Sequence, residues 1–284
     1  MSEFFLELFS EEIPASLQKN FRILLLKNFE ELFEEKHIKF KKKATYSTPN
    51  RLVILFEGLD KEISINSLEI RGPNTSAPKE ALEGFLRSNE ISEKQIYKKK
   101  NEKGEFYFYK TLPKKVKTFD ILKEFTPKIL DKIKWNKSMR WNDFELNWAR
   151  PLKSILAIYD DKKLDFKFYH LQSSNLTFID KEFEDKKRPF KNFKTYKSFF
   201  NNLDIIINHD ERKKIIEKEF NKILKRKKLS IEPNDRLLEE VVNITDQPNV
   251  LICKFDEKFL KIPKEILTIT MQHHQKYFPT FNLK

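Results

Sequence analysis

The chain opens with EFFLELFSEEIPASLQKNFRILLLKNFEELF, residues 3–33, and this stretch indicates how the protein folds. Residues 3–9, rich in phenylalanine and leucine, predict a β-strand. Polar residues and Pro14 then end the strand and begin a helix, because the missing N–H of proline is not needed in a first helical turn. Apolar side chains recur at helical spacing from Leu17 to Phe33. The sequence therefore predicts an amphipathic helix packed on a sheet.

Short connections follow this helix, too short for crossover helices, so neighbouring strands should be antiparallel. Pro127 should kink or shorten the helix in which it lies. The fold class is α+β, with mixed, largely antiparallel sheets and packed amphipathic helices. The further elements expected are strands at 41–46, 51–57, 63–70 and 152–159, short helices near 79–87 and 122–133, and a hairpin of strands 95–99 and 105–112.

Composition divides the chain into three segments. Residues 1–160 form an N-terminal α+β domain, and residues 161–209 are polar, irregular and rich in Lys, Asp and Asn, which is typical of a connecting region or a mobile insert. Residues 210–284 form a second α/β segment, whose first helix should be capped by Asp210.

The composition indicates a globular protein, and its basic charge is a first but weak indication of a nucleic-acid partner. The formal net charge is +13 over 284 residues, and lysine-rich faces attract nucleic acid by releasing counterions. A competing explanation is an AT-rich genome, since the chain has 27 Phe and only four Gly. No apolar stretch approaches the ~18 residues of a membrane helix. The acidic N-terminus does not resemble a secretory signal, so we expect a cytoplasmic protein.

Several kinds of chemistry are not indicated. The glycines lie too far apart for a phosphate-binding loop, and five His with one Cys do not form a zinc set. Cys253 ends an apolar run and should be a buried, inert side chain. His209-Asp210 could belong to a metal phosphohydrolase, the least favoured alternative. We predict no catalytic residue, no metal ligand and no cofactor held by this chain.

The strongest candidates for RNA contact lie in WNKSMRW, residues 135–141, and in the WARP that follows at 148–151. The arginine side chain offers a planar fork for phosphate, and indoles offer stacking surfaces for bases. These segments make Lys137, Arg140 and Arg150 candidate contacts. The alternative is that the tryptophans are core and the arginines pair with Asp143 or Glu145, and core burial is favoured for the tryptophans.

Two other groups of cations are weaker candidates. Arg51 follows the turn TPN, and Arg71 opens RGPN, so each could hold a phosphate or a neighbouring carboxylate, with the structural ion pair slightly favoured. His274 and Lys276 end a helix that begins at Pro263, where contact with a substrate or partner and satisfaction of the helix end are equally plausible. The adjacent His273 points about 100° away on a helix, so the two histidines cannot share a metal.

Taken in order, these segments resemble the β subunit of bacterial glycyl-tRNA synthetase. The resemblance covers nearly the whole length. Three departures stand out. The family usually has Gly where Phe9 stands, which suggests a backbone held by packing here, and Arg where Asn50 stands. It also has Gly-His-Arg-Phe where this chain has residues 176–179. The matching segments are LELFSEEIP at 6–14, TPNRL at 48–52, RGP at 71–73, the Ala81, Gly84, Phe85 and Arg87 set, KSMRW at 137–141, Arg150-Pro151 and residues 237–278.

The resemblance implies a heteromeric class II synthetase. In such an enzyme the α chain would hold ATP, Mg²⁺ and glycine, and the β chain would bind glycine tRNA and assemble with α, as an α2β2 tetramer. The family's HD-like and anticodon-binding domains are absent from this sequence, so we expect the last segment to be truncated. The main alternative is a stand-alone basic nucleic-acid-binding module.

Overall fold

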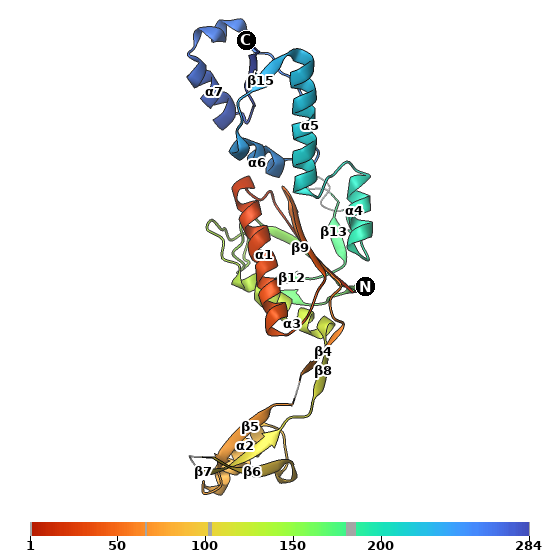
Figure 1. Cartoon of the computed structure of the whole chain (residues 1–284), viewed down its shortest axis with the longest axis vertical. Coiled ribbons are helices and arrows are strands. Elements are labelled where there is room, and N and C mark those ends of the chain that lie inside the picture. Colours follow the sequence, from red (N-terminus) through yellow and green to blue (C-terminus); the bar gives the residue numbers. More distant parts are fainter. Residues whose placement is uncertain (1, 66, 102–103, 180–185, 284) are drawn as a thin grey trace. The chain divides into compact units, whose positions relative to one another are not determined.

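The computed structural model describes residues 2–65, 67–101, 104–179 and 186–283 (Figure 1). It is an α+β fold with antiparallel sheets, as expected. The chain divides into two compact units: unit 1 combines Met1–Asp60 with Ile121–Lys284, and unit 2 is Lys61–Asp120. This division differs from the composition-based segments, which placed no border near residues 60 or 120.

The elements are distributed over both units. The helices are α1 (Ala15–Glu35), α2 (Lys79–Ser88), α3 (Thr118–Lys132), α4 (Phe193–Asn201), α5 (His209–Lys227), α6 (Asp235–Ile244) and α7 (Lys264–His273), with 3-10 turns η1 (Glu93–Gln95) and η2 (Glu257–Lys261). The strands are β1 (Glu3–Ser10), β2 (Lys42–Thr48), β3 (Arg51–Glu57), β4 (Glu62–Ile65), β5 (Glu69–Asn74), β6 (Ile96–Asn101), β7 (Gly104–Lys110), β8 (Lys114–Lys117), β9 (Leu152–Tyr159), β10 (Lys162–Lys163), β11 (Lys167–Phe168), β12 (Leu171–Gln172), β13 (Leu176–Phe178), β14 (Lys187–Pro189), β15 (Leu229–Ile231) and β16 (Thr280–Asn282).

The core of unit 1 is a five-stranded antiparallel sheet in the order β10-β9-β1-β3-β2. Successive side chains of β1 point to opposite faces of the sheet. On one face Phe4 contacts Phe29 of α1, with ring centroids 5.1 Å apart. On the other face Phe5 contacts Phe193 and Tyr196 of α4, at 5.4 and 4.8 Å. The predicted strand and amphipathic helix are confirmed, and β1 is buried on both sides because each face has its own helix.

The segment expected to be a connector contributes to this core. It contains β10 to β14 and α4, and its residues 180–185 lie outside the described part of the chain. A buried aromatic cluster of Phe190, Phe193, Tyr196 and Phe200 packs on the central sheet. Polar residues between these rings lower the mean hydropathy of the segment, which concealed its packed face. The described residues of this segment therefore belong to the core of unit 1 rather than to a separate connector.

Two local predictions need correction. Asn208, not Asp210, caps α5: its side chain accepts a hydrogen bond from the Asp210 backbone N–H at 2.9 Å. Pro127 lies inside α3, which continues to Lys132, so the proline does not shorten the helix, and the kink stays a prediction. One lost backbone hydrogen bond does not end this helix, because its neighbours Leu122 and Leu130 are fully buried.

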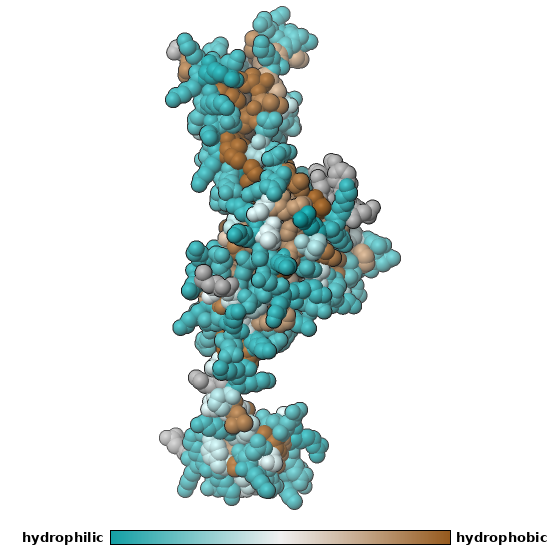
Figure 2. All heavy atoms as spheres, turned by 90° about the vertical axis from the view of Figure 1, so that its right-hand side faces the viewer, coloured by the Kyte–Doolittle hydropathy of each residue, from teal (hydrophilic) through white to brown (hydrophobic). Residues whose placement is uncertain are grey.

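The last part of unit 1, from α5 to β16, has a small core and exposes many apolar side chains. β15 pairs with β16, and Ile216 of α5 packs on Leu238 and Val242 of α6. Apolar side chains gather on the surface of this region in Figure 2, and Leu251 is 74% exposed. Cys253 is exposed, contrary to the prediction, because the run that it ends lies on this surface. No described helix is long and apolar enough to cross a membrane.

Unit 2 contains two small antiparallel sheets. The strands β4 and β8 form a two-stranded ladder, and β5, β7 and β6 form a three-stranded sheet in that order (Figure 1). The predicted hairpin is confirmed as β6 and β7. Helix α2 contacts β5, where the ring of Phe85 lies so close to Gly72 that a Cβ there would meet it at 2.9 Å. Glycine at this position therefore lets the helix approach the sheet.

Candidate nucleic-acid interface

The loop between α3 and β9 is braced by aromatic packing. Trp135 stacks on Phe21 of α1, with ring centroids 3.5 Å apart, and meets Trp148 edge to face at 5.1 Å. Both indoles are buried, and Met139 forms an isolated antiparallel bridge with Trp148. Trp141 is half-buried beside His170. The core alternative therefore holds for two of the three tryptophans, and they fix the shape of the loop rather than stack on bases.

The three cations of this loop are exposed. Arg140 Nε donates to the Phe144 carbonyl at 3.3 Å, and Arg150 Nη1 donates to the Ala149 carbonyl at 2.9 Å. Among the described residues no carboxylate lies within ion-pair distance of Lys137, Arg140 or Arg150. The ion pairs with nearby acidic residues that the sequence allowed are thus not formed. A braced loop that presents unpaired cations can bind phosphate without first breaking an ion pair.

Arg51 is placed differently. Its side chain is 2% exposed and pairs with Glu7, with Nε 3.3 Å from Oε2. Its Nη2 donates to the carbonyls of Phe178 and Ile179 at 2.6 and 3.0 Å. The guanidinium also lies over the ring of Phe9, 4.7 Å from its centroid. The structural ion pair favoured from sequence is present, and we leave Arg51 out of the proposed RNA contacts.

Glu7 is the buried anion of this network. It accepts hydrogen bonds from the hydroxyls of Thr177 and Tyr196. Burial raises the pKa of Glu7, while the charge of Arg51 and these hydrogen bonds act in the opposite direction. Burial also raises the pKa of Tyr196 well above its usual value. The network ties β1 and β3 to β13 and α4, so its role is in the core.

The remaining predicted residues are dispersed. Arg71 is exposed in unit 2, with its guanidinium carbon 3.6 Å from the ring centroid of Phe106. Lys276 pairs with Glu240 at 2.8 Å, and exposed His274 ends α7 with its N–H donating to the Thr270 carbonyl. The ion pair with Glu240 is sufficient to explain the position of Lys276 without an RNA or protein partner.

The hydrolase alternative gains no support from His209. Burial and the neighbouring charge of Arg22 lower the pKa of His209 to about 4, and its Nε2 lies 3.5 Å from Asp210 Oδ1. In the part of the chain that is described, no three His, Cys, Asp or Glu residues are grouped as a metal site would require.

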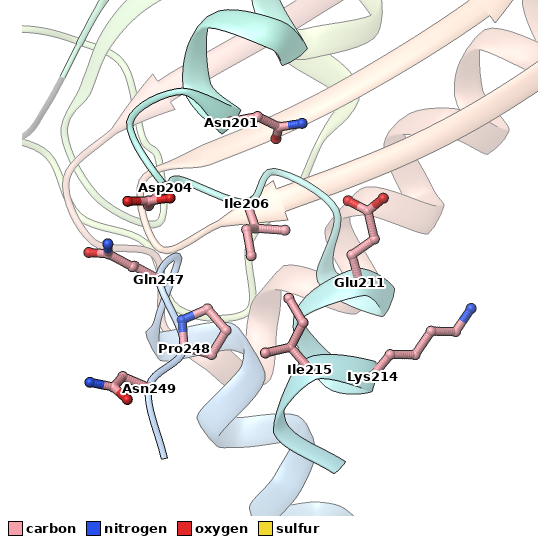
Figure 3. Close-up of a pocket in the computed structure, with 9 residues that line it drawn as sticks. All are labelled: Asn201, Asp204, Ile206, Glu211, Lys214, Ile215, Gln247, Pro248 and Asn249. Carbon is pink, nitrogen blue, oxygen red and sulfur yellow. The ribbon is translucent and has the colours of Figure 1, made fainter. Parts of the chain in front are cut away.

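A cavity of about 870 Å³ lies where the segment before α5 meets the segment after α6 (Figure 3). Ile206, Ile215 and Pro248 point toward one another in it, and Asp204, Glu211 and Lys214 line its rim. Two carboxylates against one amine do not suit a phosphate, and the residues that line the cavity do not include any predicted site residue.

The sequence reasoning missed the neighbours of Arg71. Phe108 lies opposite it on β7, and Tyr97 and Lys99 lie on the same face one strand further on, on β6. The alternating Phe and Tyr residues of β7 were a visible signal, but the face that each occupies depends on the strand register.

Comparisons with known proteins identify the class as a subunit of an aminoacyl-tRNA synthetase. The family described as glycyl-tRNA synthetase beta subunit matches residues 4–284. The chain belongs to this family, which confirms the resemblance. It is similar to the glycine–tRNA ligase beta subunits of Rickettsia canadensis (36% identity over 284 residues, 99% of this chain and 42% of the relative), Rickettsia felis (35% over 286, 99% and 43%) and Rickettsia bellii (36% over 282, 99% and 43%). The chain thus spans less than half the length of these relatives.

Proposed function

We propose that this chain acts within the β subunit of glycine–tRNA ligase, where it supports the ATP-dependent attachment of glycine to its tRNA by binding the tRNA and assembling with the α subunit. The observation that carries the RNA-binding part is the braced loop with the exposed Lys137, Arg140 and Arg150, none of which pairs with a carboxylate in the described part of the chain. ATP and Mg²⁺ would be held by the α subunit, in a cytoplasmic α2β2 assembly. No residue of this chain is assigned a catalytic role.

The chemistry of the loop supports phosphate contact. Each cation that replaces a counterion on the RNA backbone adds about one unit to the slope of log affinity against log salt. Arginine suits this role because its fork can hold two phosphate oxygens at once. The buried indoles beneath the loop keep it in place, so little ordering free energy is lost on binding.

Two measurements test the proposal. Co-expression with a glycyl-tRNA synthetase α chain should give a complex that co-purifies and charges glycine tRNA. Arg140→Ala combined with Arg150→Ala should weaken tRNA binding and lower the salt slope by about two. Arg226→Ala is the matched control, since Arg226 is an exposed arginine near the end of α5.

The outcomes separate the alternatives. Unchanged tRNA affinity and salt slope in the double variant, with the fold intact, would remove the loop from the RNA surface. A stand-alone binding module would bind RNA but would not co-purify with the α chain. A phosphohydrolase would retain a divalent ion and lose it in His209→Ala.

A further inference from the structure

One face of the β5-β7-β6 sheet in unit 2 combines aromatic rings with cations. Residues directly opposite each other in an antiparallel pair lie on the same face. Phe108 of β7 faces Arg71 on β5 and Tyr97 on β6, and Phe106 of β7 faces Lys99 on β6. These five residues, which we call the Arg71 face, form adjacent rows across the sheet.

The Arg71 face has two layers. Phe106 and Phe108 form the lower layer and are only 9% and 8% exposed. The guanidinium of Arg71 lies over Phe106 at 3.6 Å, and the ring of Tyr97 stacks on Phe108 at 6.2 Å with an interplanar angle of 26°. Lys99 Nζ lies 5.4 Å from the Phe108 centroid. Because Arg71, Tyr97 and Lys99 are exposed, the planes of the guanidinium and the phenol ring are available on this surface.

The polar contacts hold this upper layer in place. Glu69, at the start of β5, pairs with Lys99 at 2.7 Å and accepts a hydrogen bond from the Tyr97 hydroxyl. The carboxylate of Glu69 is therefore compensated, and it orients the Tyr97 ring. Arg71 has no carboxylate partner among the described residues. The Arg71 face thus offers a cation over Phe106 that has no described carboxylate partner and, over Phe108, an oriented aromatic ring.

We propose that the Arg71 face binds unpaired nucleotides of RNA. Exposed bases stack on tyrosine rings and on arginine guanidinium planes, and the charge of Arg71 attracts the neighbouring phosphate. Bases inside a duplex are already stacked on each other and cannot use such a surface. The identity of the RNA as glycine tRNA rests on the proposed function, whereas the preference for unpaired nucleotides follows from the surface itself.

The test uses the whole chain and a fluorescein-labelled, unstructured single-stranded RNA of about 12 nucleotides, the length scale of single-strand binding sites. A blunt duplex of the same sequence serves as the competitor probe. The variants are Arg71→Met and Tyr97→Leu, which keep an apolar side chain over Phe106 and Phe108. Lys98→Met is the matched control: Lys98 is exposed on the same strand, but it pairs with Tyr107 on the opposite face.

Arg71→Met and Tyr97→Leu should each weaken single-strand binding about tenfold, because one base loses its stacking partner. Lys98→Met should change it less than about threefold, and the duplex should respond equally weakly to all variants. Equal loss in Arg71→Met and Lys98→Met would mean that only overall charge matters and would overturn the proposal. Unchanged binding in both face variants, with unaltered thermal unfolding, would overturn it as well.

A protein partner is a further outcome that counts against the proposal. If Arg71→Met released the α chain while RNA affinity stayed the same, the face would belong to a protein interface. Failure of the proposed function has a different signature: the unmodified chain would neither co-purify with the α chain nor support charging, yet single-strand binding would still depend on Arg71 and Tyr97.

Discussion

Replacing Arg51 by Met should destabilise the protein strongly without weakening RNA binding. The substitution keeps an apolar side chain between the rings of Phe9 and Phe200, over which the guanidinium lies at 4.7 and 4.5 Å. It removes the positive charge beside Glu7, which is fully buried. It also removes the donor to the carbonyls of Phe178 and Ile179. The variant therefore leaves a buried carboxylate without its counterion.

The expected loss is about 3 to 5 kcal/mol at neutral pH, the usual cost of removing one partner from a buried ion pair. Protonation of Glu7 should limit this loss at lower pH. Burial already raises the pKa of Glu7 above its ordinary value, and without Arg51 that pKa rises further. When the pKa of a carboxyl is higher in the folded state than in the unfolded state, the protein becomes less stable as pH rises above the unfolded pKa, here near 4.5. Arg51→Met should thus be more destabilised at pH 7.5 than at pH 5.5.

Urea unfolding followed by tryptophan fluorescence measures this effect. The double variant Glu7→Gln with Arg51→Met should recover part of the loss, since a neutral amide replaces the unpaired charge. Arg226→Met is the surface control and should stay within about 0.5 kcal/mol. If Arg51→Met left the urea midpoint unchanged and instead weakened tRNA binding, Arg51 would be an RNA contact and the buried-pair reasoning would fail.

Three further outcomes are expected. The pKa of His209 is lowered to about 4 in the folded protein, so the free energy of unfolding should fall as pH drops from about 6.5 toward 4. His209→Gln should therefore reduce the difference in the free energy of unfolding, measured in urea, between pH 7.5 and pH 5 by about 1–2 kcal/mol. An unchanged difference would contradict the burial of this ring. Exposed Cys253 should react with one equivalent of a thiol reagent in the native protein, and reaction only after unfolding would place it elsewhere. Phe21→Ala should cost about 3–5 kcal/mol and shift the fluorescence of Trp135 to the red, whereas an unshifted spectrum would mean that the stack does not shield the indole.

Much of unit 1 could be predicted from periodicity, and the part that could not has a physical reason. The first strand and helix each keep one spacing of apolar residues, so the sequence alone shows which of their side chains are buried. Helix α4 carries Phe193, Tyr196 and Phe200 at helical spacing, which is the same signal on a shorter stretch. Averaging composition over residues 161–209 concealed it, because lysine and asparagine dominate the solvent-facing positions.

The buried network of Glu7 and Arg51 depends more strongly on tertiary pairing. Glu7 and Arg51 are far apart in sequence, and their contact follows from the antiparallel pairing of β1 with β3, which places Phe9 opposite Arg51. Two of the departures from the family pattern also meet here: the ring of Phe9 stacks on Phe178, with ring centroids 5.1 Å apart. The expectation that packing holds the backbone at Phe9 agrees with this contact. No local pattern could have paired these segments before the register was known.

The net charge of +13 identifies an RNA-binding surface less well than the position of the arginines does. Many lysines form surface ion pairs with carboxylates, such as Lys43 with Glu30 and Lys115 with Glu62. A genome that favours lysine codons would supply such residues at any exposed position. Arginine is different, since only ten of the 56 basic residues are arginine. Some, such as Arg51, are buried and use the fork on backbone carbonyls, where an amine could not replace it.

Arg71, Arg140 and Arg150 are not buried in this way, although Arg140 and Arg150 each donate one hydrogen bond to a nearby backbone carbonyl. They are exposed, lack a carboxylate partner among the described residues, and lie on or beside aromatic groups that fix their surroundings. If these positions needed only a positive charge, lysine would serve, and Arg→Lys variants would keep full RNA affinity. We expect Arg71→Lys, Arg140→Lys and Arg150→Lys each to weaken tRNA binding while leaving the salt slope unchanged, because the charge stays and the planar fork is lost. If the lysine variants bound tRNA as tightly as the unmodified protein, the arginines would contribute only positive charge, and the basic composition alone would account for RNA binding.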